Sequence, residues 1–453
     1  MSQFPADLFA KEYFSVVGLG RNGLPVARAL LAMGATVTAW DDSTTARDAA
    51  SAAGIVIANP TEAGRKPRAM ILSPGIPHLR PRVHPAAAWA RAQGVPIVSD
   101  AEILFMAVRR AGSRARFVGI TGTNGKSTTT ALLAHLLAAS GVHVAAGGNL
   151  GIAALALPYL PDHGVYVLEM SSYMLERLLT LRFDAALMLN LSPDHLDRHG
   201  DMHGYAAAKA AVFDRQEAGD TAVLGIDDAL SRDMATWRAA RPGTTITVSG
   251  LQPADCWGDG TILRDQDGPI LDLATCPALP GAHNAQNAAA SSALALALGL
   301  TRGDIARHMP SYPGLAHRQQ RVAERDGVVF INDSKATNAD AAARALGCYG
   351  RLIWIAGGMA KEGGITALAK YFPRIAHAML IGQDAPALAA TLATHGVAHT
   401  IVHTLEAAVP AAFAAARAAG VQVVLLSPAC ASFDQFSGFD ARGDRFAELA
   451  RAA

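Results

Sequence analysis

The sequence predicts an α/β protein of three domains, each built around a mainly parallel sheet. Short apolar runs rich in β-branched residues alternate with Ala- and Leu-rich helical stretches along nearly the whole chain, a pattern typical of βαβ units. The 453 residues are too many for one hydrophobic core, and about 150 residues per domain favours three domains. A polar break at 109–116 and a turn at 311–318 divide the alternation. We therefore predict domains at 1–112, 113–313 and 314–453.

Each of the three series supplies its own strands. The expected strands are 14–20, 35–42, 69–75 and 96–100 in the first series, 117–122, 142–148, 165–172, 185–191 and 221–227 in the second, and 328–334, 352–358, 378–383 and 421–429 in the third. In parallel α/β sheets, ligands bind beyond the carboxyl ends of the strands. We therefore look for functional residues where these runs end.

Composition and charge exclude several classes of protein. Hydrophobic residues make up 51% and charged residues 17% of the chain, which indicates a packed globular protein rather than a disordered one. The net charge of +1 comes without a basic stripe, so neither nucleic acid nor a membrane surface is expected as a partner. The four scattered cysteines fit neither a zinc site nor a disulfide framework. Acids in the first residues argue against a signal peptide, and no apolar run reaches the ~18 residues of a membrane span. We expect a cytoplasmic protein.

A glycine-rich turn between the expected strand 117–122 and a helical run predicts nucleotide binding. It consists of Gly122, Thr123, Asn124, Gly125, Lys126, Ser127 and Thr128. Backbone N–H groups in such a turn surround phosphate oxygens at the positive end of the helix. Lys126 would reach the β- and γ-phosphates, and Ser127 would bind Mg²⁺. The strict G-x-x-x-x-G-K-[ST] pattern is not met, because Ile120 replaces its first glycine. An ordinary βα turn is the alternative, and the Gly-Lys-Ser-Thr sequence in this context argues against it.

Polar residues also follow the next two strands. Glu169 lies near the end of the run 165–172, where a carboxylate is well placed to hold Mg²⁺. His195, His199 and His203 recur every four residues, so a helix through them would allow a zinc site. Pro193 and the pair Gly200-Asp201 favour a loop instead.

Lys209 lies in an alanine-rich helical stretch. Taken alone, it would be a solvated helix lysine.

The first series begins with a glycine-rich turn of a different kind. Gly18, Gly20 and Gly23 follow a strand and match G-x-G-x-x-G, and Asp41 ends the next strand. These residues alone favour a dinucleotide-binding dehydrogenase. The second series decides against that alternative, because a dehydrogenase has no use for a Gly-Lys-Ser-Thr loop with Glu169 and Lys209.

Taken together, the motifs resemble the Mur ligase family in their order and spacing. Segments 122–128, 169–172, 194–198 and 205–209 resemble its central motifs, 281–287 its adenine-contacting segment, and 317–318 and 332–337 its elements that close over ATP. Segment 426–436 is most similar to the members that add glutamate. The resemblance covers essentially the whole chain.

The resemblance implies an activity and a layout. The activity is an ATP-dependent, ADP-forming ligase of peptidoglycan biosynthesis, which would join D-glutamate to UDP-N-acetylmuramoyl-L-alanine through an acyl-phosphate intermediate. The layout is a Rossmann-like first domain for the UDP-substrate, a P-loop ATPase-like central domain for ATP and a Rossmann-like third domain for glutamate. It further implies two Mg²⁺ sites and a monomer.

Roles for single residues follow from the resemblance as well. Ser127 and Glu169 would hold the Mg²⁺ of the nucleotide, and His195 would hold a second Mg²⁺ together with Lys209 carbamylated by CO₂. Asn149 would contact substrate and nucleotide, beside Lys126. The other implied contacts are Asn284, Asn287, Arg318 and Asp333 for ATP, Gly18, Leu19, Gly20, Arg21, Asp41, Ser73, Pro74 and Gly75 for the UDP-substrate, and Thr337, Lys361, Ser427 and Phe433 for glutamate.

Some alternatives stay open at this point. Many relatives place an Arg or Lys soon after the acid at position 41, whereas this chain has Asp42 and Ser43, so Arg21 is the candidate cation for the diphosphate. Other Mur ligases and folylpolyglutamate synthases share the phosphate loop, and a related pocket would accept L-glutamate. A non-enzymatic nucleotide-binding partner would have no need of Lys209, Asp333 or Ser427.

Overall fold

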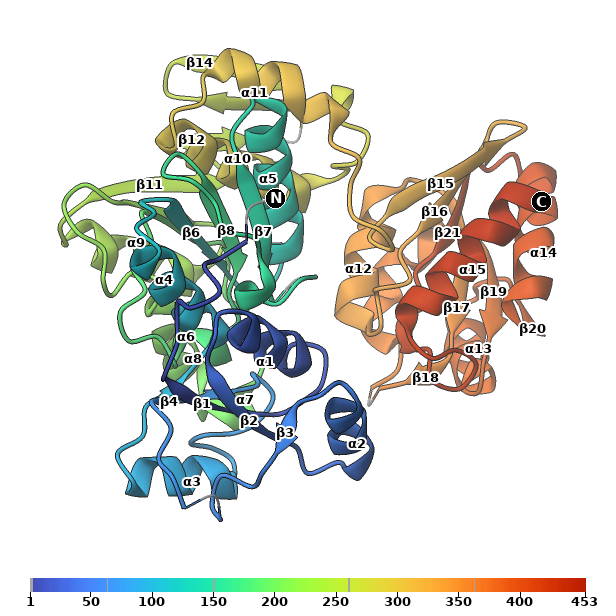
Figure 1. Cartoon of the computed structure of the whole chain (residues 1–453). Coiled ribbons are helices and arrows are strands. Elements are labelled where there is room, and N and C mark those ends of the chain that lie inside the picture. The colour runs from blue at the N-terminus through green and yellow to red at the C-terminus, as the bar shows by residue number, and fades with distance from the viewer. Residues whose placement is uncertain (1–2, 63, 150, 260, 362) are drawn as a thin grey trace. The chain divides into compact units, whose positions relative to one another are not determined.

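The computed structural model (Figure 1) describes residues 3–62, 64–149, 151–259, 261–361 and 363–453, which form two compact units around three large sheets. The first unit consists of Met1–Thr275 with Asn284–Tyr312, and the second of Cys276–His283 with Pro313–Ala453. Two large sheets belong to the first unit and one to the second. The predicted α/β fold with three mainly parallel sheets is confirmed.

The first sheet is parallel throughout and has the order β3-β2-β1-β4-β5. Its strands are β1 (Tyr13–Val17), β2 (Thr36–Trp40), β3 (Val56–Ile57), β4 (Ala69–Leu72) and β5 (Ile97–Val98), and its helices are α1 (Gly23–Ala32), α2 (Thr44–Ala52) and α3 (Pro85–Ala92). Val26 and Leu30 of α1 pack against one face of the sheet, whereas Ala86 and Ala90 of α3 pack with Val17 on the other. Burial on both faces explains why the central strands are continuous apolar runs.

The second sheet has nine strands in the order β14-β13-β12-β11-β10-β9-β6-β8-β7. The strands are β6 (Arg116–Thr121), β7 (Val144–Gly148), β8 (Val165–Glu169), β9 (Ala185–Met188), β10 (Thr221–Gly225), β11 (Thr244–Ser249), β12 (Cys256–Gly258), β13 (Ile262–Asp265) and β14 (Gly268–Asp272). Its helices are α5 (Lys126–Ala139), α6 (Ser172–Leu175), α7 (Leu196–His199), α8 (Met202–Ala210), α9 (Ala229–Ala239), α10 (Ala282–Ala297) and α11 (Arg302–His308). All pairings are parallel except those of β12 with β13 and β13 with β14.

Helix α4 (Asp100–Arg110) joins the first two sheets into one unit. Ile103, Leu104 and Ala107 lie in a single core that extends from β1 to Phe117 of β6. Buried Glu102 accepts hydrogen bonds from the backbone N–H groups of residues 179, 180 and 181 at 2.8–3.1 Å. Apolar packing and a satisfied buried acid together fix the two sheets relative to each other.

The third sheet has the order β15-β16-β21-β17-β19-β20, with β15 antiparallel at one edge. Its strands are β15 (Gln320–Arg325), β16 (Val328–Asn332), β17 (Leu352–Gly357), β19 (Ile375–Ile381), β20 (His399–His403) and β21 (Val423–Leu426). A separate two-stranded ladder joins β18 (Met359–Ala360) to β22 (Cys430–Ala431). The helices are α12 (Ala339–Cys348), α13 (Ala385–Thr394), α14 (Leu405–Ala419) and α15 (Phe439–Ala452).

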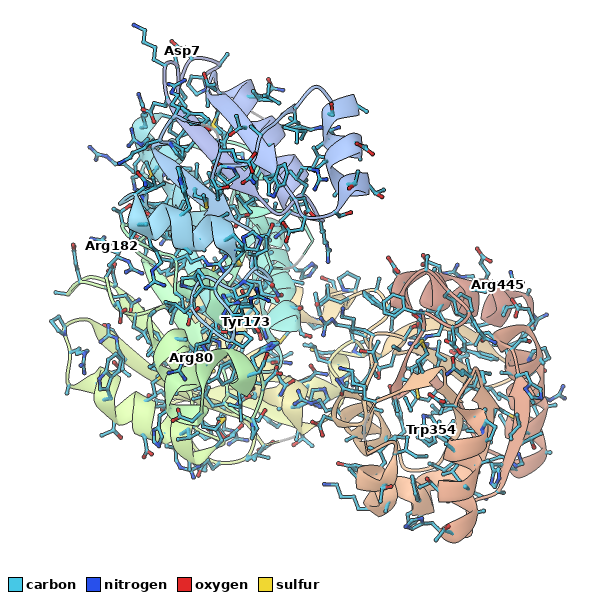
Figure 2. The ribbon with its side chains drawn as sticks, turned by 90° about the horizontal axis from the view of Figure 1, so that it is seen from below. Asp7, Arg80, Tyr173, Arg182, Trp354 and Arg445 are labelled. Carbon is cyan, nitrogen blue, oxygen red and sulfur yellow. The ribbon has the colours of Figure 1, made fainter. Side chains whose placement is uncertain are left out.

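Strand β17 separates two cores inside the second unit. Trp354, labelled in Figure 2, packs with α12 and α13 on one face, whereas Ile353 and Ile355 pack with α14 and α15 on the other. Successive side chains of a strand point to opposite faces, so one apolar run fills both cores.

Every strand expected from the sequence is present, but the ends shift by a few residues and several strands were missed. The missed strands are β3, β11, β12, β13, β14, β15, β18, β20 and β22. Most of them are partly exposed: β20, for example, has only intermediate and exposed positions. Such strands lack the continuous apolar run that marks a strand buried on both faces. No helix in the described part of the chain is long and apolar enough to cross a membrane.

Candidate active site

The glycine-rich turn after β6 has the strand–loop–helix context that the sequence predicted. Gly122 and Gly125 both have positive φ, 146° and 84°, and α5 begins at Lys126. A Cβ on Gly125 would lie 2.3 Å from Asn287 Oδ1 and 2.4 Å from Leu189 Cδ2, so only glycine fits there. The Nζ of Lys126 donates to the carbonyl oxygens of Gly122 and Thr123 at 2.9 Å each. The ammonium group therefore lies over the turn.

Side-chain amides hold this loop in place. Asn190 accepts a hydrogen bond from Asn124 N at 2.9 Å and donates to Asn124 O at 3.2 Å and to Gln286 Oε1 at 3.1 Å. Asn287, a predicted ATP contact, donates to Asn284 Oδ1 at 2.9 Å and accepts from Thr129 Oγ1 at 3.2 Å. The structure thus brings Asn287 beside the loop. Asn190 and Gln286 were given no individual role from the sequence, although Asn190 lies two residues after the end of β9 and Gln286 lies in the segment 281–287.

The carboxylate of Glu169 lies at the end of β8 with one oxygen unpaired. Glu169 is 2% exposed, and its Oε1 accepts a hydrogen bond from Asn149 Nδ2 at 2.7 Å. The Oε2 atom is buried and has no hydrogen-bond partner in the described part of the chain. A buried carboxylate oxygen without a donor is costly, and a hard cation such as Mg²⁺ would satisfy it. Glu169 therefore fits the predicted Mg²⁺ site.

Lys209 is buried, which rules out the solvated helix lysine. It is 2% exposed, and its Nζ donates to Gly122 O at 2.9 Å and to Thr121 Oγ1 at 3.3 Å. The amines of Lys126 and Lys209 therefore share the carbonyl oxygen of Gly122. Burial, and then the charge of Lys126, lower the pKa of Lys209 well below its ordinary value, although Asp194 and Glu169 oppose this. The low pKa favours a neutral amine, the form that reacts with CO₂.

The histidine segment is not one helix. Gly200, with φ of 89°, separates α7 from α8. His195 has φ of 53°, and its ring contacts Tyr173 and Tyr205 at centroid distances of 5.1 and 6.4 Å. The Nζ of Lys209 lies 4.7 Å from the centre of the Tyr205 ring. His195 and Lys209 thus flank one aromatic ring.

His199 has a structural environment instead. Its Nε2 lies 2.9 Å from Ser172 Oγ and its Nδ1 3.2 Å from Glu176 Oε1. Burial and then Arg198 lower its pKa to about 4. Among the described residues, no group of three or more His, Cys, Asp or Glu side chains could hold a metal. Because Gly200 separates α7 from α8, the three histidines do not lie on one helix, as the zinc site allowed by their spacing would need.

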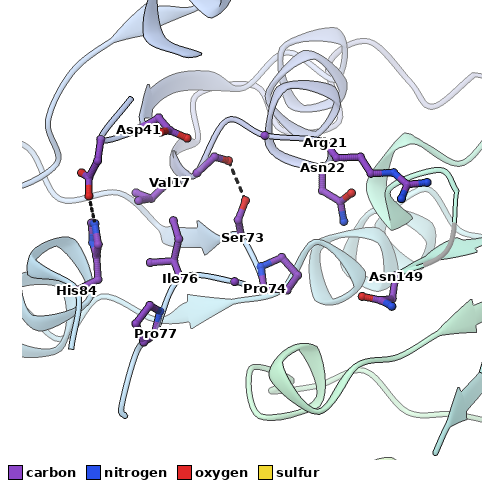
Figure 3. Close-up of a pocket in the computed structure, with 14 residues that line it drawn as sticks. Val17, Arg21, Asn22, Asp41, Ser73, Pro74, Ile76, Pro77, His84 and Asn149 are labelled. Carbon is purple, nitrogen blue, oxygen red and sulfur yellow. Dashed lines mark hydrogen bonds and ion pairs between the residues drawn. The ribbon is translucent and has the colours of Figure 1, made fainter. Parts of the chain in front are cut away.

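A pocket of about 600 Å³ opens beyond the carboxyl ends of the first sheet (Figure 3). It is lined by Val17, Gly18, Gly20, Arg21, Asn22, Asp41, Asp42, Ser73, Pro74, Gly75, Ile76, Pro77, His84 and Asn149. Seven of the eight residues predicted for the UDP-substrate are among them. The eighth, Leu19, is buried, and its N–H donates to Asp41 Oδ2 at 2.6 Å. Asn149 connects the pocket to Glu169, because it lines the pocket and its amide donates a hydrogen bond to Glu169 Oε1.

Contacts of Ser73 and His84 also shape this pocket. Ser73 Oγ donates to Gly18 O at 2.8 Å, which ties the glycine turn to the opposite wall. His84 caps α3 by accepting from Ala86 N, and its Nε2 lies 3.2 Å from Asp42 Oδ2. The dashed lines in Figure 3 mark the contacts of Ser73 with Gly18 and of His84 with Asp42. His84 was missed from the sequence, because a histidine before a helix carries no signal for a ligand pocket.

In the second unit, Asp333 and Ser427 form a buried pair. Ser427 Oγ donates to Asp333 Oδ2 at 2.8 Å, and Gln319 N donates to Oδ1 at 3.2 Å. Burial raises the pKa of Asp333 to about 7, against the lowering effect of these hydrogen bonds and of Arg318. The sequence placed Asp333 at ATP and Ser427 at glutamate, and the structure joins them by one hydrogen bond.

The other residues predicted for glutamate are more accessible. Thr337 is partly buried, Lys361 is exposed, and Phe433 is 71% exposed. The β18–β22 ladder pairs Ala360 with Cys430, so it holds the segment that leads to Lys361 beside the one between Ser427 and Phe433. Each of these residues lies near the end of a strand of the third sheet or in the segment that follows it.

Comparisons with known proteins give matches over nearly the whole chain. Residues 120–295 match the Mur ligase middle domain, and residues 317–430 match the Mur ligase, glutamate ligase domain. The chain is 51% identical over 443 residues to the UDP-N-acetylmuramoylalanine--D-glutamate ligase of Paramagnetospirillum magneticum, covering 96% of each chain. It is 47% identical to the Rhizobium meliloti protein of the same name, covering 98% of this chain and 96% of the relative.

Solved structures show the same fold at lower identity. UDP-N-acetylmuramate-alanine ligase MurC from Thermotoga maritima superposes with a TM-score of 0.60 at 17% identity, covering 97% of this chain and 99% of that one. MurF from Acinetobacter baumannii gives a TM-score of 0.58 at 19% identity, covering 76% and 80%.

Proposed function

Because this chain belongs to the Mur ligase family, we propose that it is an ATP-dependent ligase that adds D-glutamate to UDP-N-acetylmuramoyl-L-alanine in peptidoglycan biosynthesis. The relatives that are 45–51% identical along almost their whole length carry this activity in their names. Their identity level and coverage support the same substrates for this chain. A dehydrogenase, the alternative that the first glycine turn favoured, has no support among them.

The observation that carries the proposal is the meeting of two lysines at Gly122. Lys126 and Lys209 both donate to its carbonyl oxygen at 2.9 Å, beside a loop shaped to bind phosphate. Burial of Lys209, and then repulsion from the charge of the partly buried Lys126, lower the pKa of Lys209. A neutral buried amine that reacts with CO₂ becomes an anionic carbamate, so Lys209 would act as a carboxylate. A nucleotide-binding module without chemistry has no need of such a residue.

The reaction follows from these groups in two steps. The alanyl carboxylate attacks the γ-phosphorus of ATP, the bond to ADP breaks, and Lys126 neutralises charge on the transferring group. The neutral glutamate amine then attacks the acyl-phosphate carbon, the C–O bond to phosphate breaks, and the nitrogen releases a proton as the amide forms. Holding both partners in reactive geometry contributes roughly 7–11 kcal/mol.

The proposed metal ligands come from the residues around this loop. Ser127 and Glu169 would hold the Mg²⁺ of the nucleotide, and His195 with carbamylated Lys209 would hold a second. Bound there, Mg²⁺ supplies Lewis-acid neutralisation of the phosphoryl oxygens. The unpaired Oε2 of buried Glu169 supports the first of these sites.

The three ligands are assigned to three ranges of the chain. We assign the UDP part to 1–112, through the pocket of Figure 3, with Arg21 at its rim as the cation for the diphosphate. We assign ATP to 113–313, with Arg318 and Asp333 as further contacts, and D-glutamate to 314–453, through Thr337, Lys361, Ser427 and Phe433. One chain supplies every residue in this account, and we propose that it acts as a monomer in the cytoplasm, where ATP and nucleotide sugars are made.

One assay tests the proposal directly. Phosphate release from ATP is measured with UDP-N-acetylmuramoyl-L-alanine and with D-glutamate, L-glutamate or no amino acid. We expect sustained release only with D-glutamate and Mg²⁺. Equal release with L-glutamate would contradict the stereochemistry, and release without the UDP-substrate would contradict the ligase. Titration with NADH in place of UDP tests the dehydrogenase alternative.

A further inference from the structure

A buried arginine outside the proposed catalytic residues holds one wall of the UDP pocket, which we define as residues 72–78. Arg177 is 2% exposed. Its Nη1 donates to Leu72 O at 2.6 Å and Ser73 O at 3.0 Å, and its Nη2 donates to Ile76 O at 2.5 Å. Ser73 and Ile76 line the pocket. One guanidinium group therefore fixes the backbone of this wall at three points.

His78 connects Arg177 to a second arginine. Its Nδ1 accepts from Arg177 Nε at 3.3 Å and faces Arg198 Nη2 at 3.2 Å. Both guanidinium groups can only donate, so Nδ1 carries no proton and the imidazole is neutral. Burial, followed by the charges of Arg177 and Arg198, lowers the pKa of His78 to about 3, which keeps the ring in this form at neutral pH.

The two arginines come from the segments that carry the proposed metal ligands. Arg177 follows α6, which begins three residues after Glu169. Arg198 lies in α7, which begins directly after His195. His199 ties these segments together through Ser172 and Glu176. The guanidinium group of Arg198 also lies 4.6 Å from the centre of the Tyr173 ring. The residues that contact the pocket wall therefore belong to the same segments as the proposed metal ligands Glu169 and His195.

We propose that Arg177 and Arg198, joined through His78, are positioning residues that hold the pocket wall in the shape that binds the uridine-diphosphate part of the substrate and fix that wall relative to Glu169 and His195. The inference rests on the proposed function. It adds Arg177 and His78, which lie outside the sequence motifs, and it gives a role to Arg198, which lies in segment 194–198 but had none assigned. Binding energy from the remote diphosphate end can place the reacting carboxylate only if the two regions are rigidly connected.

The first test replaces Arg177 with lysine in the full-length chain. Arg177→Lys keeps the charge, but a single ammonium cannot reach the acceptors that the planar fork reaches. We expect the Kd for UDP, measured by calorimetry, to rise about ten- to a hundredfold, the range for losing hydrogen bonds of a charged donor. The KM for the UDP-substrate should rise, while the KM for ATP stays near the wild-type value.

Arg238→Lys is the matched control. Arg238 is 1% exposed and donates to Gln216 Oε1 at 3.1 Å and to Arg241 O at 3.4 Å, and neither acceptor lines the pocket. Its replacement should lower thermal stability without changing the Kd for UDP. A purely structural role for Arg177 would make the two variants behave alike.

Two variants of His78 test the proposal even if Arg177→Lys does not fold. In His78→Asn the amide oxygen can take the place of Nδ1 as acceptor, whereas His78→Leu removes the acceptor. UDP binding should be near wild type in the first and weaker in the second. Wild-type UDP binding in His78→Leu and in any folded Arg177→Lys would overturn this inference alone. A wild-type chain that binds no UDP would overturn the proposed function and this inference together.

Discussion

The two glycine-rich strand-to-helix turns, 18–23 and 122–126, look alike in the sequence but contact different charged groups. Both exclude a side chain at one glycine: a Cβ on Gly23 would lie 1.8 Å from Gly18 O, and one on Gly125 would lie 2.3 Å from Asn287 Oδ1. The carboxylate of Asp41 accepts the Leu19 N–H at 2.6 Å. In the second, Lys126 and Lys209 donate to Gly122 O. A carboxylate thus contacts the first turn, whereas two amines contact the second.

The difference teaches that glycine spacing defines a turn's shape, whereas neighbouring charges define its ligand. The Asp41 carboxylate beside the first turn suits hydroxyl and amide groups of a nucleoside, which can donate to it, and Arg21 of the same turn is the proposed cation for the diphosphate. A turn with two amines suits the transferring phosphoryl group, whose charge grows in the transition state. The following predictions test this division, from the largest expected effect to the smallest.

Lys126→Ala should have the largest effect. The ammonium group serves the transferring phosphoryl, so we expect ligation to fall by at least about 100- to 1000-fold. Because Lys126 does not line the UDP pocket, the Kd for UDP should change by no more than about twofold. Rate assays and calorimetry measure the two quantities. Equal loss of both would contradict the separation of the two turns.

Lys209→Arg tests the second amine. Arginine keeps a positive charge but cannot form the carbamate, so we expect a folded protein with activity lowered at least about 100-fold. Lys209→Ala should be equally inactive, and added acetate or propionate should restore part of its activity by supplying a carboxylate. Circular dichroism checks the fold. An arginine variant with close to full turnover would mean that Lys209 carries no carbamate.

Gly23→Ala tests the steric constraint of the first turn. The new methyl group would collide with the backbone oxygen of Gly18, so we expect destabilisation of more than about 1 kcal/mol and loss of UDP binding. Gly20→Ala is the control, since a Cβ there meets no atom within 4 Å, and its effect on stability should stay within about 0.5 kcal/mol. Denaturant unfolding measures the stability of each variant, and titration measures its UDP binding. Similar behaviour of the two variants would show that the close approach of Gly23 is unimportant.

Asp41→Asn should have the smallest effect. The amide can accept from Leu19 N or Ser43 N, but it does so without the charge of the carboxylate that accepts both. We expect UDP binding to weaken about three- to tenfold, with ATP binding unchanged. Exposed Asp48 in α2 offers Asp48→Asn as a control for net charge. Unchanged UDP binding in Asp41→Asn would show that the charge of Asp41 does not contribute to UDP binding.

How much could be predicted differs between fold and site. The continuous apolar runs of β6, β8, β9 and β17 revealed strands buried on both faces, because burial requires apolar side chains throughout. Partly exposed strands such as β11 and β20 carry polar residues that occur equally in loops, and they were missed. The boundaries of the three predicted domains stay predictions, because a single core with α4 in it unites the first two sheets.

The sequence by itself determined the α/β class, the positions of both glycine turns and the residues at the ends of the strands. These features depend on local periodicity and on the backbone freedom of glycine, which neighbouring residues express directly. Only the tertiary structure decided that Lys209 is buried against Gly122, that Ser427 binds Asp333, and that Arg177, His78 and Arg198 support the pocket wall. Those contacts join residues 87 to 120 positions apart. Burial, pKa and hydrogen-bond partner are properties of the packed surroundings, and the local sequence does not contain them.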